Sequence, residues 1–204
     1  MTVKLIIPTT PEREHRLSEC IYYIKKHTDC VKTPYVMWIY ENKLGGVVKP
    51  YRELLADAGT SLVVLLADDV LVPPNWLEHL LVVYNTKKKE NDGKAEVVVS
   101  ADHGDGEELA CFVLGPADLI LRYYHPDYIH NYADTEFTAI TKKRGVLHFD
   151  LEVKIQNFDR IKLTWLMDDT YKLQESTYPV DKLTFNRHKI ESRDWEDLGL
   201  ITTK

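Results

Sequence analysis

The sequence predicts an α/β fold with a mostly parallel central sheet flanked by helices. Three apolar segments of strand length, at 3–8, 35–40 and 62–66, alternate with two segments of helical periodicity. This β-α-β-α-β order is typical of parallel strands joined by right-handed crossovers. A chain of 204 residues can bury one substantial core, so we expect a single domain.

The first strand-to-helix unit runs from VKLIIP at 3–8 into a helix that begins near Pro11. Leu17 and Ile24 fall on one face of this helix. Thr10 suits the N-cap and Pro11 the first helical position. The turn would leave backbone N–H groups free at the carboxyl end of the strand, although a plain capped helix explains the pattern equally well.

The second and third strands are separated by a polar loop and a short helix. YVMWIY at 35–40 is the second strand, and a helix from about 50 to 58 ends at Gly59. LVVLL at 62–66 has the length and β-branched content of a strand that is covered on both faces.

Two adjacent carboxylates, Asp68 and Asp69, come directly after this third strand. The carboxyl ends of parallel strands are where α/β folds bind ligands. Acids at this point also suit the start of the next helix, whose Trp76 and Leu80 have core-facing spacing. We favour ligand binding, because an apolar segment separates the acids from that helix.

The second half of the chain is less regular. AEVVVS at 95–100 and CFVL at 111–114 are predicted strands on either side of a polar loop at 102–108. DTEFTAITKKRG at 134–145 is predicted as a helix, with acid at its start, base at its end and a glycine as the stop. Alternation at 146–158 predicts one or two antiparallel strands, the small antiparallel element of the second half.

Composition and charge narrow the function classes. The formal charge is -6, from 26 basic and 32 acidic residues. The chain lacks the excess of positive charge that binds nucleic acid, so we expect no nucleic-acid partner. Three cysteines without CxxC spacing argue against a disulfide framework and a zinc cluster. The chain has no transmembrane segment, and its first apolar run is too short for a signal peptide. We therefore expect a cytoplasmic protein, compatible with peripheral membrane contact.

Four segments, taken in order, resemble the nucleotide-diphospho-sugar glycosyltransferases of the GT-A fold, especially the inverting family 2 group. They are KLIIPTTPER, the second strand with Glu41-Asn42, VVLLADDVLVPPNWLEHLL and YADTEFTAITKKRG, which span residues 3–145, about 70 % of the chain. The resemblance implies one GT-A domain over 1–204, with 1–110 as the nucleotide-sugar-binding half and 111–204 as the acceptor-binding and catalytic-base half. The chain also resembles a compact enzyme of viruses of thermophilic archaea, which would act in the host cytoplasm.

This resemblance implies which residues contact the donor, a nucleotide-diphospho-sugar. Pro8, Thr9 and Glu12 match the nucleotide-facing opening turn of the family. Glu41 and Asn42 match the positions that contact base or ribose after the second strand.

The resemblance assigns the metal to Asp69, the last acid of the family's D-x-D motif, with Asp68 as a contact to ribose or metal. The motif reads Ala67-Asp68-Asp69 here, so alanine replaces the usual first acid. Mn²⁺ or Mg²⁺ binds carboxylate and phosphate oxygens and would stabilise the departing nucleoside diphosphate. The second half offers three candidates for a further ligand, of which the first is preferred: His188, His148 and Asn157.

Inverting transfer needs a base that takes the proton from the acceptor hydroxyl. Asp134 matches the base position in the family's acidic motif, although a helix N-cap role explains it as well on local sequence. Glu136 is the reserve candidate, as base or as a residue that orients the acceptor, and Asp150 is the third. We expect contacts to the acceptor, a glycan, protein or lipid hydroxyl, from the loop at 102–110.

Two other functions compete with glycosyl transfer. A sugar-phosphate nucleotidyltransferase also places carboxylates in a nucleotide-binding α/β sheet, but its opening turn is usually rich in glycine, whereas the turn here is PTTPER. A non-catalytic module that binds nucleotide-sugars would fit Ala67 and the short second half. The family resemblance favours hexosyl transfer over both alternatives.

Overall fold

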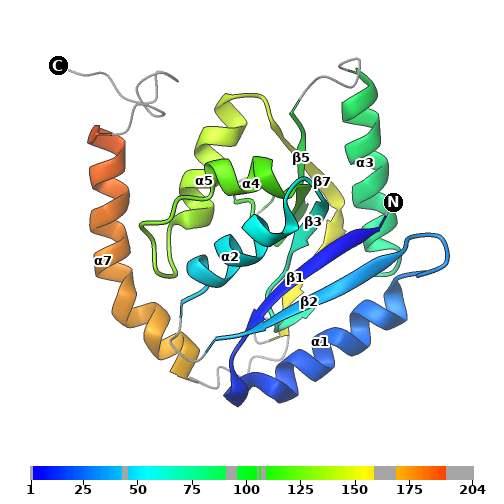
Figure 1. Cartoon of the computed structure of the whole chain (residues 1–204), viewed down its shortest axis with the longest axis horizontal. Coiled ribbons are helices and arrows are strands. Elements are labelled where there is room, and N and C mark those ends of the chain that lie inside the picture. Colours follow the sequence, from blue (N-terminus) through cyan, green and yellow to red (C-terminus); the bar gives the residue numbers. More distant parts are fainter. Residues whose placement is uncertain are drawn as a thin grey trace.

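A six-stranded sheet forms the centre of the molecule, with its strands in the order β2-β1-β3-β6-β5-β7 (Figure 1). The computed structural model describes residues 2–42, 46–90, 96–104, 106, 109–158 and 169–191. β1 pairs in parallel with β2 and β3, β5 pairs in parallel with β7, and β6 is antiparallel to both of its neighbours. The predicted mostly parallel α/β sheet is thereby confirmed. The strands are β1 (Val3–Thr9), β2 (Tyr35–Glu41), β3 (Leu62–Leu65), β5 (Val98–Asp102), β6 (Val113–Pro116) and β7 (Leu147–Lys154).

Helices cover both faces of this sheet (Figure 1). One core lies beneath α2, α4 and α5, and a second lies beneath α1 and α3. In β1, Ile6 packs into the first core while Leu5 and Ile7 pack into the second. A strand between two cores needs apolar residues throughout, which explains the unbroken apolar runs. The helices of the described residues are the short 3-10 helix η1 (Pro11–Arg13), α1 (Glu14–His27), α2 (Val48–Ala58), α3 (Trp76–Glu90), α4 (Ala117–Tyr123), α5 (Ala133–Lys143) and α7 (Asp169–Glu191).

The small antiparallel element expected at 146–158 is present, but it is shorter than predicted. Most of the segment forms β7, which runs parallel to β5 in the central sheet. Only β8 (Gln156–Asn157) is antiparallel, and it pairs with β4 (Val70–Leu71) in a separate two-stranded sheet. β7 is at the edge of the sheet, and buried and exposed side chains are mixed along it. Alternation does not fix the direction of the strand.

Helix α7 lies along the side of the molecule, beyond α2 and α5 (orange in Figure 1). The sequence predicts no element for the polar tail from residue 186, and the part of this tail beyond residue 191 lies outside the described residues. The side chains that α7 buries are polar ones, Thr177, Asp181 and His188, and Pro179 stands inside the helix. Hydrophobic periodicity therefore gives no sign of this helix.

Asp181 attaches α7 to the loop that precedes α5. Its carboxylate is fully buried and accepts backbone N–H bonds from Ile129 at 2.9 Å, His130 at 2.9 Å and Asn131 at 2.7 Å. Three consecutive amides around one carboxylate form an anion-binding nest.

Replacement of Asp181 by alanine is expected to lower the free energy of unfolding by about 3 kcal/mol or more, because three backbone N–H groups lose their buried, charged acceptor. Denaturant unfolding followed by circular dichroism measures this change. Asp57→Ala, at an exposed acid on α2, is the matched control and should change stability by less than about 0.5 kcal/mol. Equal effects of the two substitutions would contradict an anchoring role for Asp181.

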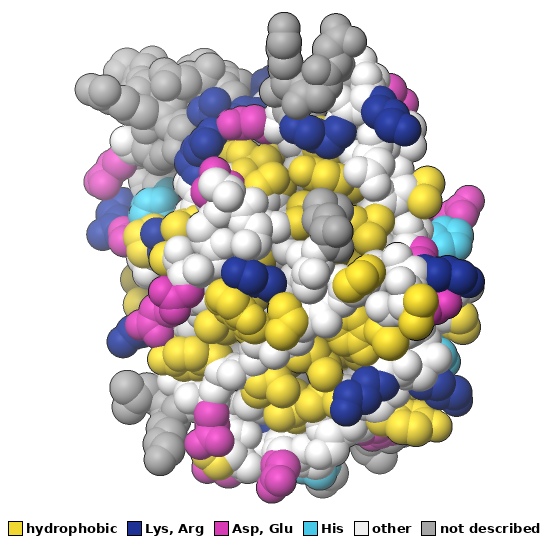
Figure 2. All heavy atoms as spheres, turned by 45° about the vertical axis from the view of Figure 1, so that its right-hand side comes forward, with side chains coloured by type: hydrophobic (Ala, Val, Ile, Leu, Met, Phe, Trp, Pro, Cys, Tyr) yellow, Lys and Arg dark blue, Asp and Glu magenta, His cyan; other side chains and the backbone are white. Residues whose placement is uncertain are grey.

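The surface mixes charge and apolar side chains. On the face in Figure 2, Lys and Arg side chains and Asp and Glu side chains are interspersed around a wide hydrophobic area. β2 is an edge strand, and its Val36 and Ile39 side chains are exposed. Among the described residues, no helix combines the length and the apolar character needed to cross a membrane.

Candidate active site

A cavity of about 930 Å³ opens where β1, β2 and β3 reach their carboxyl ends. This volume falls in the range of small-molecule binding sites. Thr9 is the last residue of β1, Asn42 follows β2, and the two acids follow β3 by a few residues. The first half of α7 and the start of α5 contribute the remaining wall. Among the lining residues are Pro8, Thr9, Arg13, Asn42, Ala67, Asp68, Asp69, His103, Cys111, Tyr132, Asp134, Asn157, Tyr171 and Tyr178.

Asp68 lies in the floor of this cavity with only 3 % of its surface exposed. The Thr9 hydroxyl donates a hydrogen bond to its Oδ2 at 2.7 Å, and the Arg13 guanidinium lies 3.3 Å from its Oδ1. Burial raises the pKa of Asp68 to about 6, although Arg13 and the Thr9 hydroxyl act in the opposite direction. Asp68 therefore titrates close to neutral pH.

Asp69, equally buried, is surrounded by donors from three parts of the chain. Arg13 donates to its Oδ2 at 2.5 Å, the Tyr171 hydroxyl donates at 3.2 Å, and the Asn157 amide donates to its Oδ1 at 3.1 Å. Arg16 lies 3.8 Å away. Two carboxylates thus face two buried guanidinium groups, an arrangement that offsets the cost of burying each charge.

The 3-10 turn η1 explains why Arg13 reaches the acids. The Arg13 amide donates to the Thr10 carbonyl at 3.0 Å, which closes the turn. Arg13 and Arg16 are three residues apart, so their side chains project from the same side of the helical segment. Thr10 is the N-cap residue as predicted, but its side chain makes no capping hydrogen bond.

Asp134, the predicted base, lines the same cavity at the start of α5. Its Oδ1 accepts a bond from the Thr135 amide at 2.8 Å, and its Oδ2 accepts one from the Cys111 thiol at 3.5 Å. Burial raises the pKa of Asp134, while the Thr135 amide opposes the rise. The N-cap of α5 is Tyr132, in a left-handed conformation, so Asp134 does not serve as the cap. Its carboxylate is available to the cavity.

Comparison with known proteins shows the fold. No family model matches the sequence, and no curated protein sequence matches it. Residues 1–349 of S. aureus TarS align over 77 % of this chain and 60 % of that one, at 12 % identity and a TM-score of 0.55. Glucosyl-3-phosphoglycerate synthase from Mycobacterium tuberculosis, solved with Mn²⁺, UDP and phosphoglyceric acid, aligns over 72 % and 67 %, at 11 % identity and a TM-score of 0.52. The protein has a GT-A type fold.

A viral protein is also similar to this GT-A chain, though more weakly. A197 from STIV aligns over 78 % of this chain and 86 % of that one, at 15 % identity and a TM-score of 0.45. A similarity at this level carries no argument about origin, so the expectation of a viral source stays a prediction.

Several of the site residues predicted from sequence line the cavity of this GT-A chain. They are Pro8, Thr9, Asn42, Asp68, Asp69 and Asp134. Asn157, one of the candidates for a further ligand, bonds to Asp69 and lines the cavity too. In the predicted acceptor loop at 102–110, His103 and Leu109 line the cavity, while residues 105, 107 and 108 lie outside the described residues.

Six other candidates are not among the lining residues. Glu12 and Glu41 are exposed. Glu136 follows Asp134 by two residues, about 200° around the helix, and its buried carboxylate bonds to Tyr128 and His188 instead. The His188 ring lies in this second cluster rather than beside Asp69. The other two candidates, both on β7, are His148 and Asp150.

Sequence reasoning missed the cationic and aromatic side of the site. Arg13 and Arg16 bond to or face the acids, and Tyr171 bonds to Asp69 while both guanidinium groups lie over its ring, at 5.7 and 5.6 Å. An arginine pair in the turn after the first strand was a usable signal, since the acids after the third strand end at the same edge of a parallel sheet. Tyr171 stood out only as one of several aromatic residues in the second half, and it could not be placed beside Asp69 because its helix was not recognised.

Proposed function

We propose that the protein is a glycosyltransferase that moves a sugar from a nucleotide-diphospho-sugar to an acceptor hydroxyl, with inversion and with a divalent cation. The observation that carries the proposal is a single cavity that holds Asp68, Asp69 and Asp134. The M. tuberculosis synthase, which has the same fold, was solved with Mn²⁺ and UDP, and this supports the same class of donor here. A hexose is the sugar that the family resemblance favours.

The ligand atoms in the cavity suit Mn²⁺ or Mg²⁺. Asp68 and Asp69 offer carboxylate oxygens, and the Asn157 amide offers a third hard oxygen once it is turned about its terminal bond. Asp69 is bonded to Arg13, so a cation at this carboxylate requires the guanidinium to move aside. When bound, the cation supplies stabilisation of the negative charge on the leaving diphosphate.

Arg13 and Arg16 supply fixed positive charge at the same place. Both are buried, and both face Asp69, Arg13 from the turn η1 and Arg16 from the first turn of α1. A guanidinium that leaves Asp69 stays close to the carboxyl ends of β1 and β3, where the diphosphate of a donor would lie. Preformed charge of this kind stabilises a developing anion without reorganisation.

Asp134 is the proposed base. In a single displacement, the acceptor oxygen forms the new bond to the anomeric carbon while the bond to the diphosphate breaks, and the hydroxyl proton passes to Asp134. A carboxyl with a raised pKa is a stronger base than an ordinary aspartate. The Thr135 amide and the Cys111 thiol hold the carboxylate in one orientation. His103 and Leu109 are placed to contact the acceptor.

A donor screen tests the proposal. Thermal shift with a panel of nucleotide-sugars, with and without Mn²⁺, identifies a donor by the rise in apparent stability that binding causes. The donor found is then assayed for transfer to glycan, protein and lipid acceptors. Release of pyrophosphate from a nucleoside triphosphate and a sugar phosphate would instead support a nucleotidyltransferase. Tight binding without turnover would support a non-catalytic module.

Donor binding is expected to weaken with acid because of Asp68. Burial favours the protonated form, so its carboxylate is mostly charged above pH 6 and mostly neutral below it. Between pH 7 and pH 5 the charged fraction falls about tenfold, and Mn²⁺-dependent binding should fall by about the same factor. Calorimetric titration with a nucleotide-sugar, whose diphosphate does not ionise in this range, measures the change. The Asp68→Asn variant should bind weakly at both pH values; a full tenfold dependence in this variant would contradict the assignment.

A further inference from the structure

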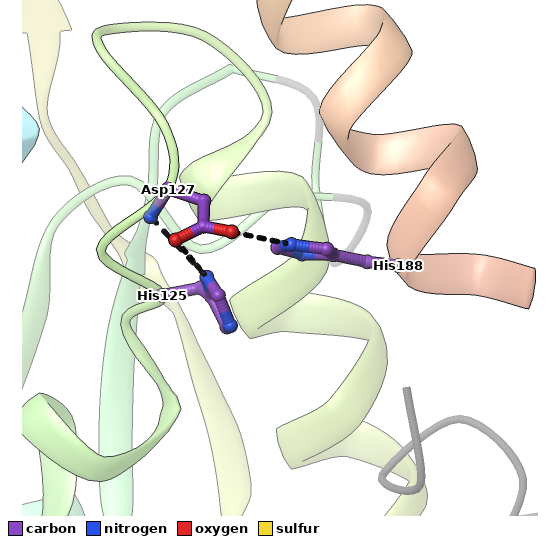
Figure 3. Close-up of side chains that lie close together, drawn as sticks. All are labelled: His125, Asp127 and His188. Atoms are coloured by element: carbon purple, nitrogen blue, oxygen red, sulfur yellow. Dashed lines mark hydrogen bonds and ion pairs between the residues drawn. The ribbon is translucent and has the colours of Figure 1, made fainter. Parts of the chain in front are cut away.

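A second cluster of metal-ligand side chains lies outside the cavity. His125 and Asp127 belong to the loop between α4 and α5, and His188 comes from the C-terminal part of α7 (Figure 3). The His188 Nε2 atom lies 3.3 Å from Asp127 Oδ2, and the His125 Nδ1 atom lies 3.9 Å from Asp127 Oδ1. One ligand atom from each of the three residues falls within 4.8 Å of the other two.

The buried partner of His188 determines which of its nitrogens faces the cluster. Its Nδ1 atom lies 2.9 Å from Glu136 Oε2, and only 2 % of the Glu136 surface is exposed. The Tyr128 hydroxyl also donates to this carboxylate. In the neutral ring, a carboxylate at Nδ1 favours the proton on that nitrogen, which leaves Nε2, the nitrogen beside Asp127, as the metal ligand. Metal-binding histidines are commonly fixed by a carboxylate in this way.

His125 presents a lone pair to the same place. The Asp127 backbone amide donates to its Nδ1 at 3.3 Å, so in the neutral ring this nitrogen is the one without a proton, and a metal ion there would replace this hydrogen bond. The centres of the two imidazole rings are 4.0 Å apart (Figure 3).

We propose that His125, Asp127 and His188 bind a zinc ion. Zinc prefers imidazole nitrogen and carboxylate oxygen at about 2.0–2.2 Å, which places tetrahedral ligand atoms about 3.3 Å from one another. The present N···O separations are 3.3 Å for His188 and 3.9 Å for His125, so small side-chain rotations would bring the ligand atoms to this spacing. The exposed side of Asp127 leaves the fourth position to water. Arg187, which bonds to Asp127 at 2.9 Å, is half exposed, so its guanidinium can return to solvent at little cost.

Such an ion would connect α7 to the loop before α5 at a second point, beyond the Asp181 nest. The first half of α7 lines the cavity through Tyr171 and Tyr178, so the zinc would help to hold this wall in place. The cluster contributes no residue to the cavity lining, and the proposal is independent of glycosyl transfer.

Cobalt spectroscopy and thermal shift on the full chain test this site. After chelator treatment and dialysis, the protein should bind one equivalent of Co²⁺ with the strong visible absorption of a tetrahedral site. Zn²⁺ should displace the Co²⁺, and an excess of Zn²⁺ about 100-fold above Kd should raise Tm by about 5–10 °C. The His125→Ala and Asp127→Asn variants should lose both signals, with folding checked by circular dichroism. His79→Ala, at an exposed histidine 3.7 Å from Glu152, is the matched control and should keep both.

A further variant separates this site from the cavity. Asp69→Asn should keep the cobalt spectrum, because an all-oxygen site gives weak octahedral absorption. No tetrahedral spectrum with the wild-type chain would overturn the proposal. A spectrum that survives both His125→Ala and Asp127→Asn, or one that only Asp69→Asn removes, would overturn it as well.

Discussion

The Asp134→Asn variant is expected to lose sugar transfer and to keep donor binding. General-base catalysis contributes about 10²- to 10⁴-fold to a rate, so kcat should fall by at least about 100-fold. Asparagine has the shape of aspartate and can still accept the Thr135 amide bond, so the start of α5 should be preserved. The Mn²⁺-dependent thermal shift with the donor should match that of the wild-type chain. Measurement of kcat and KM with the donor found in the screen checks both expectations.

The matched control for this experiment is Asp150→Asn. Asp150 is also a buried acid in the second half, and it was an alternative base on sequence grounds, but it is on β7 and is not among the cavity residues. Its substitution should leave kcat within about twofold, as expected of a side chain outside the reacting groups. A wild-type rate for Asp134→Asn, or a large loss only for Asp150→Asn, would remove Asp134 from the mechanism.

The part of the cavity at the edge of the sheet could be predicted because its residues follow strands. Once 62–66 is recognised as a buried strand, the position of Asp68 and Asp69 at the edge of the sheet follows from parallel topology alone. Thr9 and Asn42 follow for the same reason, since they come at the ends of β1 and β2. Local pattern and global topology agree here, and prediction works where they agree.

The site residues in the second half of the chain were harder to predict, because their neighbours are distant in sequence and their contacts are polar. The family resemblance supported Asp134 as the base. Glu136 could be distinguished from it only in the structure, where the two side chains point in different directions from α5. His188 was expected near Asp69, but no periodicity showed that α7 is a helix or which face it buries. A polar buried face satisfies its hydrogen bonds individually, as Asp181 does, and leaves no repeating signal.

Asp69→Ala is expected to weaken Mn²⁺-dependent donor binding by at least about 100-fold, a loss of about 2.7 kcal/mol. The substitution removes the carboxylate that the family resemblance assigns to the cation and also takes an acceptor from Arg13, Asn157 and Tyr171. Calorimetric titration with the donor, in Mn²⁺ and in a chelator, distinguishes loss of the cation from loss of the hydrogen bonds to Asp69. If the cation bridges Asp69 and the diphosphate, wild-type binding is strong in Mn²⁺ and weak in the chelator, and the variant binds weakly in both.

Arg13→Ala distinguishes a cation-dependent site from one that relies on arginine. With a cation in place, this variant should still respond to Mn²⁺, because both carboxylates remain and their competitor has gone. Its stability should fall by about 3–5 kcal/mol without the cation, since two buried acids lose their nearest positive charge. Mn²⁺ should recover part of that loss, because it binds the folded state and restores the missing charge. Donor binding that is indifferent to Mn²⁺ in the wild-type chain and abolished by Arg13→Ala would instead make the arginines, and not a metal, the counter-charge of the diphosphate.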